Sequence, residues 1–381
     1  IPGDGVRVIA VTSALPEVTD PVIIDGYTQP GAAPNSLAVG SNAVILIELD
    51  GTAAGDAVNG FYLTSGGSTI RGLAITYFTY AGIEIDYGGA NTIAGNHIGV
   101  DASGAVAKRN GVGTMWDGIV IGWISSSGAN VIGGQAPADR NVISANEGAG
   151  IWMTATSGGN VIRGNYIGTN AAGTAAIANG QYGILLAGPG DEVIDNVISA
   201  NAAGYPGILA PSAATGTIIR GNRIGTTAGG TGALGNGGPG IRLESANNVV
   251  GGTDAGDANL IAHNAGAGVV VTAGNVGNAI LGNSIHSNTG IGIDLGDNGV
   301  SLNNGSKSST QANRGMDAAV FTAASVSGGQ VTVAGYVGSQ IGQSVFANAR
   351  VEVFVSDTDA SGYGEGRTYL GTVTTNAQGS F

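Results

Sequence analysis

The sequence predicts an all-β protein: a right-handed parallel β-helix of about 10 rungs, with three short strands per rung, followed by a partial immunoglobulin-like β-sandwich. Three observations predict this class. The phrase Asn-x-Ile-x-Gly-Asn-x-Ile-Gly, or a close variant, recurs at 91–99, 160–168, 217–225 and 278–286. A second phrase, Gly followed by an apolar residue, stands between the copies, and its shortest spacing is 24 residues (183 to 207 and 268 to 292). The third observation is composition.

Glycine makes up 71 of the 381 residues, whereas charged residues make up only 10%. Rungs that cover one another leave little surface that needs charge, and glycine supplies corners with positive φ. The chain has no Gly-X-Y period, which excludes collagen, and its 43% hydrophobic content excludes a disordered chain.

Charge and composition also exclude several partners. The net charge is −13 and the basic residues are scattered, so we expect no nucleic-acid partner, which would need a basic stripe. The sequence contains no cysteine and no apolar run of membrane-spanning length. Ile1 stands where a start methionine would, which suggests a processed or excised fragment.

The elements follow in order along the chain. Short apolar runs predict opening strands at 6–11, 21–25, 43–49 and 69–74. We expect the β-helix over 1–300, with its most regular part at 82–298, a Ser/Asn/Gly-rich linker over 301–318 and the sandwich module over 319–381. Within the module, alternation predicts strands at 330–337, 350–356 and 368–375. About 60 residues is short of the roughly 100 of a complete sandwich, so we expect this module to be truncated.

Each rung is predicted to carry a Gly-Ile strand, an Asn-x-Ile-x-Gly strand and an Asn-x-Ile strand. Because alternate residues of a strand face opposite sides, the Ile side chains point inward and stack in columns. The asparagine after each glycine falls at a turn, where its amide can bond the neighbouring rung. These asparagines are Asn96, Asn165, Asn196, Asn222 and Asn283.

Three longer loops, at 100–117, 169–182 and 226–239, each contain an Asn-Gly pair. We expect them to project from one side of the β-helix, next to the Gly-Ile strands, as a wall, a lid or a partner contact.

The opening segments Ile1-Pro2-Gly3-Asp4-Gly5 and Pro21-Val22-Ile23-Ile24-Asp25-Gly26-Tyr27-Thr28-Gln29-Pro30-Gly31 resemble the start of the pectate-lyase-like superfamily. More closely, the chain resembles the Gly/Asn-rich right-handed β-helix repeat proteins of bacterial surfaces. The repeated phrases, the stretch at 132–144 and Ser361-Gly362-Tyr363-Gly364-Glu365-Gly366 carry this resemblance. It implies the fold and a secreted or cell-surface setting, and it implies no particular activity.

Polysaccharide lyases and hydrolases of that superfamily work on the outer face of a parallel sheet, so the outward positions matter. The middle residues of the Gly-Ile strands are expected to face outward: Glu84, Val120, Trp152, Leu185, Leu209, Arg242, Val270 and Asp294. The central members provide neither a base nor a carboxylate pair. The best hydrolase-like cluster is Glu84 and Asp86, which share one strand face, with Asp117 near the next rung.

The apolar central members of this outward set would form a stripe on the surface, and an exposed apolar stripe of this kind marks an interaction site. We expect it to be buried under the long loops or in an oligomer contact. The alternative is a sugar-stacking groove at Trp152, with Trp116, Trp123 and Tyr166 as further ligand-binding candidates.

Two acidic runs could hold Ca²⁺ through oxygen ligands. The first contains Asp294 and Asp297, and the second contains Asp357, Asp359 and Glu365. Neither matches a full calcium loop, so turn roles are favoured and no other cofactor is expected.

The sequence thus favours a non-catalytic extracellular or cell-surface β-helix, a scaffold or adhesin fragment that binds glycans or associates with itself into an oligomer or filament. The alternative is a polysaccharide lyase or glycoside hydrolase that acts on the outer face of the β-helix.

Overall fold

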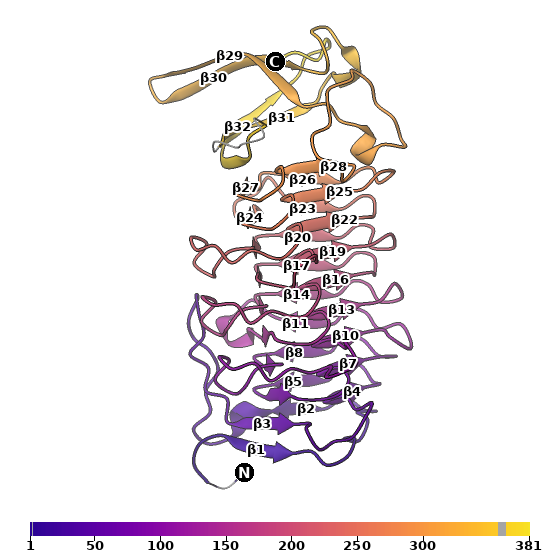
Figure 1. The fold of residues 1–381 in the computed structure, drawn as a ribbon, viewed down its shortest axis with the longest axis vertical. Helices are drawn as coiled ribbons and strands as arrows, with labels where there is room; N and C mark the ends of the chain where they lie inside the picture. Colours follow the sequence, from indigo (N-terminus) through magenta and orange to yellow (C-terminus); the bar gives the residue numbers. More distant parts are fainter. Residues whose placement is uncertain (2, 357–362) are drawn as a thin grey trace.

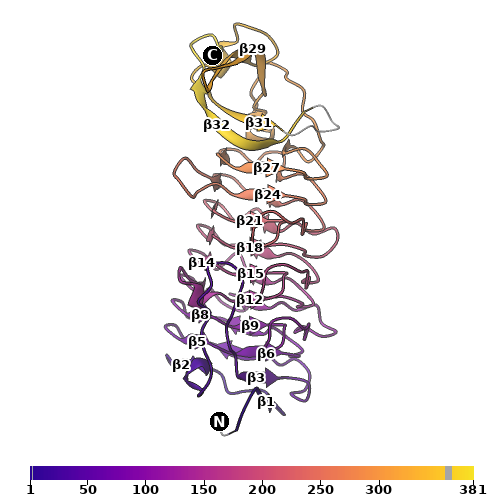
Figure 2. The same cartoon turned by 90° about the vertical axis from the view of Figure 1, so that its left-hand side faces the viewer.

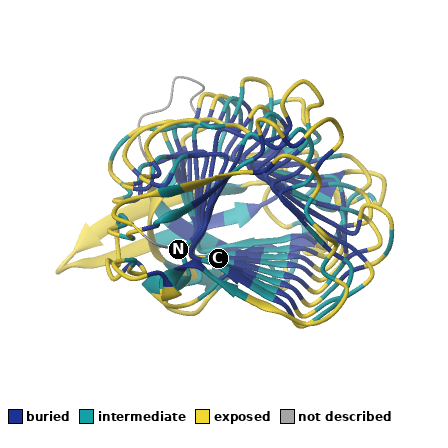
Figure 3. Cartoon of the chain, turned by 90° about the horizontal axis from the view of Figure 1, so that it is seen from below, coloured by how far each residue is buried: buried dark blue, intermediate teal, exposed yellow. Residues whose placement is uncertain are grey.

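A computed structural model describes residues 1, 3–356 and 363–381 of the chain. Three long parallel sheets wind around one apolar core, and a small antiparallel region lies at the C-terminal end (Figures 1 and 2). Seen along its axis, the coil has a roughly triangular section with its buried residues inside (Figure 3). In the described residues, no helix is both long enough and apolar enough to cross a membrane.

The first sheet contains the Gly-Ile strands. Its strands are β4 (Phe61–Leu63), β7 (Ile83–Ile85), β10 (Ile119–Ile121), β13 (Ile151–Met153), β16 (Ile184–Leu186), β19 (Ile208–Ala210), β22 (Ile241–Leu243), β25 (Val269–Val271) and β28 (Ile293–Leu295).

The second sheet contains the Asn-x-Ile-x-Gly strands. Its strands are β2 (Ile23–Asp25), β5 (Thr69–Arg71), β8 (Thr92–Ala94), β11 (Val131–Gly133), β14 (Val161–Arg163), β17 (Glu192–Ile194), β20 (Ile218–Arg220), β23 (Val249–Gly251) and β26 (Ala279–Leu281).

The third sheet contains the Asn-x-Ile strands. Its strands are β1 (Arg7–Ala10), β3 (Ile47–Asp50), β6 (Ala74–Thr76), β9 (His97–Ile98), β12 (Val142–Ile143), β15 (Tyr166–Ile167), β18 (Val197–Ile198), β21 (Arg223–Ile224), β24 (Leu260–Ala262) and β27 (Ser284–His286).

The remaining elements are short 3-10 turns and the C-terminal strands. They are η1 (Gly26–Thr28), η2 (Pro137–Asp139), η3 (Ala312–Arg314), η4 (Ser344–Phe346), β29 (Ala319–Ser327), β30 (Gln330–Val337), β31 (Arg350–Ser356) and β32 (Gly366–Thr374).

The predicted columns of aliphatic side chains are confirmed. Ile151 pairs in register with Ile119 below and with Ile184 above, and all three side chains are fully buried. On the outer face of the same strands, Trp152 pairs with Leu185. Stacking identical side chains rung upon rung gives one continuous apolar core, in which each rung is supported by its two neighbours.

Three ladders of buried polar side chains, mainly asparagine, run along the turns. In most rungs an asparagine donates from its backbone N and from Nδ2 to Oδ1 of the residue one rung further along; Asn165, for example, donates to Asn196 at 2.9 and 3.0 Å. Asn110 and Asn179 donate from Nδ2. The first ladder, before the second sheet, is Asn91, Asn130, Asn160 and Asp191, then, after a break at Thr217, Asn248 and Asn278. The second, before the third sheet, is Asn96, Asn141, Asn165, Asn196, Asn222, Asn259 and Asn283. The third, before the first sheet, is Asn110, Asn146, Asn179, Asn201, Asn236, Asn264 and Asn288.

The N-terminal part differs from the expectation in detail. The run expected as one strand at 69–74 is two strands, β5 and β6, because the chain turns a corner at Gly72, whose φ is +71°. The strand expected at 43–49 is restricted to β3. Strand β4 was not predicted, because Phe61–Leu63 lacks the preceding Asn-x-Ile phrase.

The long loops lie over a different sheet from the one expected. Their first halves fold back over the third sheet, where Val100 and Ala171 pack with Val142, and Ala228 packs with Tyr166. They also bond to one another, because Ala171 N donates to Gly104 O at 2.8 Å. Burial of the Gly-Ile strands under the loops therefore does not hold for these first halves, whereas Trp116, near the end of the 100–117 loop, lies with Trp123 and Trp152 at the first sheet.

A second covering segment, residues 29–46, is called the strap. It leaves the first rung, runs along the coil and returns, and the bridge between Ala33 and Val44 joins its two legs (Figure 2). At its tip, Gly40 N donates to the Tyr166 hydroxyl at 2.8 Å. The strap thus spans several rungs of the third sheet.

The C-terminal region consists of two antiparallel pairs, β29 with β30 and β31 with β32. Strand β32 lies beside β27, where the Ser284 hydroxyl donates to Arg367 O at 2.6 Å (Figure 1). Of the strands predicted here, β30 and β31 are confirmed at the expected residues, and the strand expected at 368–375 is β32 at Gly366–Thr374, whereas β29 was not predicted.

Candidate functional site

The outward residues of the first sheet are largely sealed, although the first halves of the long loops lie over the third sheet instead. Val120 and Val270 are at most 1% exposed, and Glu84, Leu209 and Asp294 are at most 8% exposed. Only Trp152, Leu185 and Arg242 are half-buried among the eight predicted positions.

Aromatic side chains cover the middle of this face. The rings of Tyr80 and Trp116 stack at 4.5 Å between centroids, Trp116 meets Trp123 edge to face at 5.2 Å, and Trp123 meets Trp152 edge to face at 5.4 Å. We call these four residues the aromatic row. Trp123 is 48% exposed, and the other three are half-buried. The row thus presents ring surface to the solvent.

Local sequence positions these rings. Trp152 is the central residue of β13, and its outward orientation follows from the strand alternation. Trp116 precedes β10, and Trp123 follows it after Gly122, whose φ of +78° turns the chain outward.

A carboxyl pair lies under the loop that carries Trp123. Asp86 Oδ1 accepts from Ile124 N at 3.0 Å and from Ser125 N at 3.3 Å, and so anchors this loop. Asp86 is fully buried, and its Oδ2 has no hydrogen-bond partner among the described residues. Burial, then a hydrogen bond with Asp86, raises the pKa of Glu84 to about 7, although Asn59 also bonds Glu84. A carboxyl group with a pKa of about 7 is partly protonated at neutral pH, and in that form Glu84 can donate to Asp86.

Asp117 does not join this pair. Its carbonyl accepts from Gly82 N, one rung below and two residues before Glu84, and its side chain is bonded by Ala149 N. Burial raises the pKa of Asp117 to about 7, and one of its oxygens is buried with no hydrogen-bond partner in the described part of the chain. The structure therefore brings together Glu84 and Asp86 of the three predicted carboxylates, and it places both out of contact with bulk solvent.

Tyr166 lies on another face. It belongs to β15 in the third sheet, is 3% exposed, and has the Arg140 guanidinium 4.4 Å from its ring centre. The structure brings Trp116, Trp123 and Trp152 together and separates Tyr166 from them.

The proposed calcium ligands have other partners. Asp294 accepts from Asn298 N and Gly299 N in a turn, and Asp297 forms an ion pair with Arg242 at 2.7 Å. Glu365 bonds Asn288, whereas Asp357 and Asp359 lie outside the described residues. In the described parts of the chain, no three His, Cys, Asp or Glu side chains gather where they could hold a metal ion.

Sequence reasoning missed Tyr80 and Asn59, which complete the row and the carboxyl pair. Tyr80 stands two residues before the Gly82-Ile83 phrase, and in later rungs Trp116 and Tyr205 hold the corresponding positions. That recurrence of aromatic residues was the available signal.

A family model supports the fold over part of the chain. A family model described as "Right handed beta helix region" matches residues 35–224. The chain is similar to the A-module of the mannuronan C-5 epimerase AlgE4 from Azotobacter vinelandii, with 18% identity and a TM-score of 0.34 over 64% of this chain and 62% of that one. It is also similar to full-length tailspike protein 2 of the Escherichia coli O157:H7 bacteriophage CAB120, with 11% identity and a TM-score of 0.26 over 87% of this chain and 47% of that one.

The chain thus spans less than two thirds of either solved protein, and nothing about its function follows from similarity this loose. The family match and the three parallel sheets wound into one coil agree, however, with the repeats of the sequence. The chain therefore has the right-handed parallel β-helix fold, and its residues 35–224 match the family model for that fold.

Proposed function

We propose that this chain is a non-catalytic, glycan-binding β-helix of a secreted or cell-surface protein, and that a sugar ring stacks on the aromatic row. One observation carries the proposal. The chain has only three tryptophans, separated by up to 36 positions in sequence, and all three meet in one row on one face.

The exposure of Trp123 supports this proposal. A tryptophan is among the side chains that gain most from burial, and this one leaves 48% of its surface in water. The neighbouring residue Ile124 is 60% exposed, and Met115, which precedes Trp116, is 58% exposed. An apolar surface of this kind marks a binding face, and the C–H face of a sugar ring is a suitable partner for an indole.

The rigidity of the row also favours binding. Trp116 and Trp152 are fixed by their neighbouring rings, and Trp123 sits on a loop that Asp86 anchors. A preformed surface loses little side-chain entropy when a ligand binds.

The test is affinity electrophoresis and calorimetry of the whole chain against a panel of neutral and uronate-containing polysaccharides. Trp123→Ala should weaken binding at least tenfold, and Trp123→Phe should retain part of it. Phe321→Ala is the matched control, because Phe321 is an aromatic residue with 49% exposure on β29, far from the row. Equal retention of wild type and Trp123→Ala would refute the proposal.

A second candidate function is glycoside hydrolysis or polysaccharide elimination at Glu84 and Asp86. The observation that favours it is the pKa of Glu84, about 7, which suits a general acid at neutral pH. The observation against it is burial, because Glu84 is 4% exposed and Asp86 is fully buried. A reducing-sugar assay and an assay for unsaturated uronates, with Glu84→Gln as control, distinguish the two. Turnover by wild type that Glu84→Gln abolishes would replace the first proposal.

We infer self-association as a further part of this function. The hairpin of β29 and β30 projects from the C-terminal end, and Val326 at its tip is 75% exposed (Figure 1). An open two-stranded edge is a template for pairing with a second copy. Sedimentation at rising concentration should show oligomers that Val326→Lys reduces, whereas a strict monomer at all concentrations would remove this part.

A further inference from the structure

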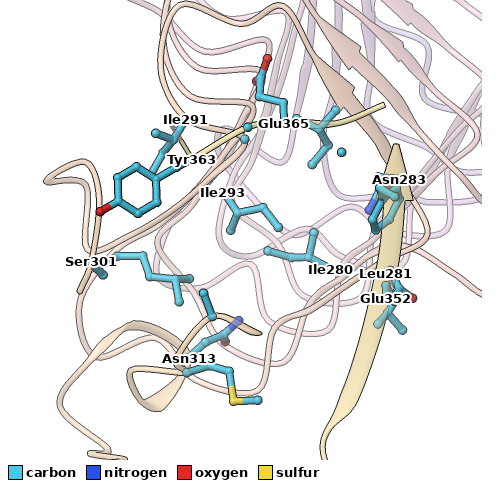
Figure 4. A pocket seen from close by; sticks show the side chains of 18 of the residues that line it. Ile280, Leu281, Asn283, Ile291, Ile293, Ser301, Asn313, Glu352, Tyr363 and Glu365 are labelled. Atoms are coloured by element: carbon cyan, nitrogen blue, oxygen red, sulfur yellow. Dashed lines mark hydrogen bonds between the residues drawn. The ribbon is translucent and has the colours of Figure 1, made fainter. Parts of the chain in front are cut away.

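A cavity of about 560 Å³ lies between the last rung of the β-helix and the C-terminal region. Figure 4 shows Ile280 and Ile293 in the middle of its lining, with Asn283 and Glu352 on one side and Tyr363 on the other. Most of the lining is apolar, and Met316 and Phe354 add to it. This size is in the range of cavities that hold small organic ligands.

The three asparagine ladders end beside this cavity, and two of them are capped. Asn278 N, at the end of the first ladder, donates to Asn313 Oδ1 at 3.0 Å. Asn288, at the end of the third ladder, donates from N and Nδ2 to the Glu365 carboxylate at 3.0 and 2.9 Å. Each cap places an oxygen where the next asparagine Oδ1 would be.

The second ladder ends at Asn283 without such an oxygen. Asn259, one rung earlier, donates to Asn283 from N at 3.0 Å and from Nδ2 at 2.8 Å. Asn283 itself is 4% exposed and lines the cavity, and its Nδ2 donates to Val250 O. Within the residues that the structure describes, no oxygen accepts from Asn283 N or from the second hydrogen of Nδ2. The nearby Glu352 carboxylate accepts from Gly282 N and from Arg350 instead.

These two donors converge on one point, because in every earlier rung the same pair meets a single amide oxygen. A buried donor without an acceptor costs on the order of 1–3 kcal/mol, so this point favours an acceptor atom from a ligand. The cavity wall around it is apolar, so the rest of the ligand must be apolar as well.

The residues that line the cavity indicate the charge of the ligand. Glu352, which pairs with Arg350, and Glu365 both line the cavity, and no lysine or arginine does so among the described residues, so the wall offers an anionic ligand no cation. An ammonium group has no acceptor to offer Asn283. We propose that this cavity binds a neutral acyl compound, whose carbonyl oxygen accepts from Asn283 N and Nδ2 and whose hydrocarbon chain lies against Ile280 and Ile293.

The test uses octanamide as the probe and calorimetry of the whole chain. Octanoate and octylamine have the same chain with an anionic and a cationic head group. We expect saturable binding of octanamide, at least tenfold tighter than that of either charged analogue, because the acidic wall disfavours octanoate and octylamine has no acceptor for the two donors.

Two variants locate the site. Ile293→Trp fills the cavity and should abolish binding, whereas Ile23→Trp, at an exposed position at the opposite end of the coil, should leave it unchanged. Asn283→Asp replaces a donor by an acceptor and should weaken octanamide at least tenfold, and circular dichroism checks that this variant folds. The absence of saturable octanamide binding, equal affinity for octanoate, or unchanged affinity in Ile293→Trp would each overturn the proposal.

Discussion

The carboxylate of Glu365 occupies the place of the next asparagine above Asn288. It accepts from Asn288 N at 3.0 Å and from Asn288 Nδ2 at 2.9 Å, as Asn288 Oδ1 accepts from Asn264 at 3.1 and 2.9 Å. The C-terminal region therefore completes a polar ladder of the β-helix by a side chain 77 positions further along the chain. It also covers the last rung, whose edge would otherwise be open to pairing.

Glu365→Ala should separate the C-terminal region from the β-helix. Removing the carboxylate leaves two buried donors of Asn288 without an acceptor, at a cost of about 2–4 kcal/mol. Limited proteolysis of the 296–318 segment measures the loss, and the variant should be cut several times faster than wild type. Glu365→Gln is the matched control, because one amide oxygen can accept both bonds, as Asn288 Oδ1 does from Asn264. Equal cutting of the Ala and Gln variants would show that the ladder does not hold this junction.

The β-helix could be predicted from the repeats because it depends on two local features of each rung. An inward Ile and a turn Asn recur with each rung, so Ile151 and Asn165 could be placed from sequence alone. The strap and the cap of Glu365 were not predictable, because each joins residues far apart in sequence through single contacts that no period marks. The three tryptophans were identified as candidates, but their contact depends on the lengths of the turns around β10.

Asp191→Asn should stabilise the protein at neutral and alkaline pH. Asp191 holds a position of the first ladder, where Asn160 bonds its Oδ1, but its Oδ2 is buried without a partner in the described structure. Burial raises the pKa of Asp191 to about 7, against about 3.9 in the unfolded chain. The unfolded chain thus releases the proton first, and folding stability falls as the pH rises from about 4 to about 7.

An amide at this position carries no charge to bury. The midpoint of thermal unfolding should therefore be higher in Asp191→Asn than in wild type at pH 8, by a free energy on the order of 2–4 kcal/mol, and nearly equal at pH 4. Asp254→Asn, at an exposed position, controls for the change in net charge. The same gain at both pH values would contradict this explanation.

The fluorescence of Trp123 should change with a midpoint near pH 7, and Glu84→Gln should remove that change. Glu84 has a folded pKa of about 7, above its unfolded value, so its contribution to stability is complete at low pH and is lost as the pH rises through 7. Loss of the proton places two carboxylates together under the loop that Asp86 anchors. Glutamine keeps a donor for Asp86 at every pH. A transition that persists unchanged in Glu84→Gln would assign it to another group.

Ile167→Ala should strongly destabilise the β-helix. Ile167 is fully buried between Ile143 and Ile198 of the neighbouring rungs, so truncation leaves a cavity in a continuous column. We expect a loss of about 2–5 kcal/mol for Ile167→Ala and about 0.5–1.5 kcal/mol for Ile167→Val in urea unfolding. Val106→Ala, at 55% exposure in a loop, should stay within about 0.5 kcal/mol. A loss as small for Ile167→Ala as for Val106→Ala would contradict the column as the source of stability.

Arg140→Ala should release the strap. The Arg140 guanidinium donates to Leu37 O at 3.0 Å and to Ala38 O at 2.8 Å, also bonds Gly40 O, and lies over the Tyr166 ring. A planar group with several donors can bond three carbonyls and stack at once, and an ammonium cannot, so Arg140→Lys should release the strap almost as much.

The measurement is limited proteolysis at the strap tip, where Leu37 is 44% and Val39 is 54% exposed. Both Arg140 variants should be cut at least tenfold faster there than wild type, because cleavage requires the tip to leave the third sheet. Arg163→Ala, which removes an ion pair with Asp195 on the second sheet, should leave the rate unchanged, since exposed pairs contribute at most about 1 kcal/mol. Fast cutting of wild type at the tip would mean that the strap opens without any change at Arg140, and that the Tyr166 face is open to solvent in the folded protein.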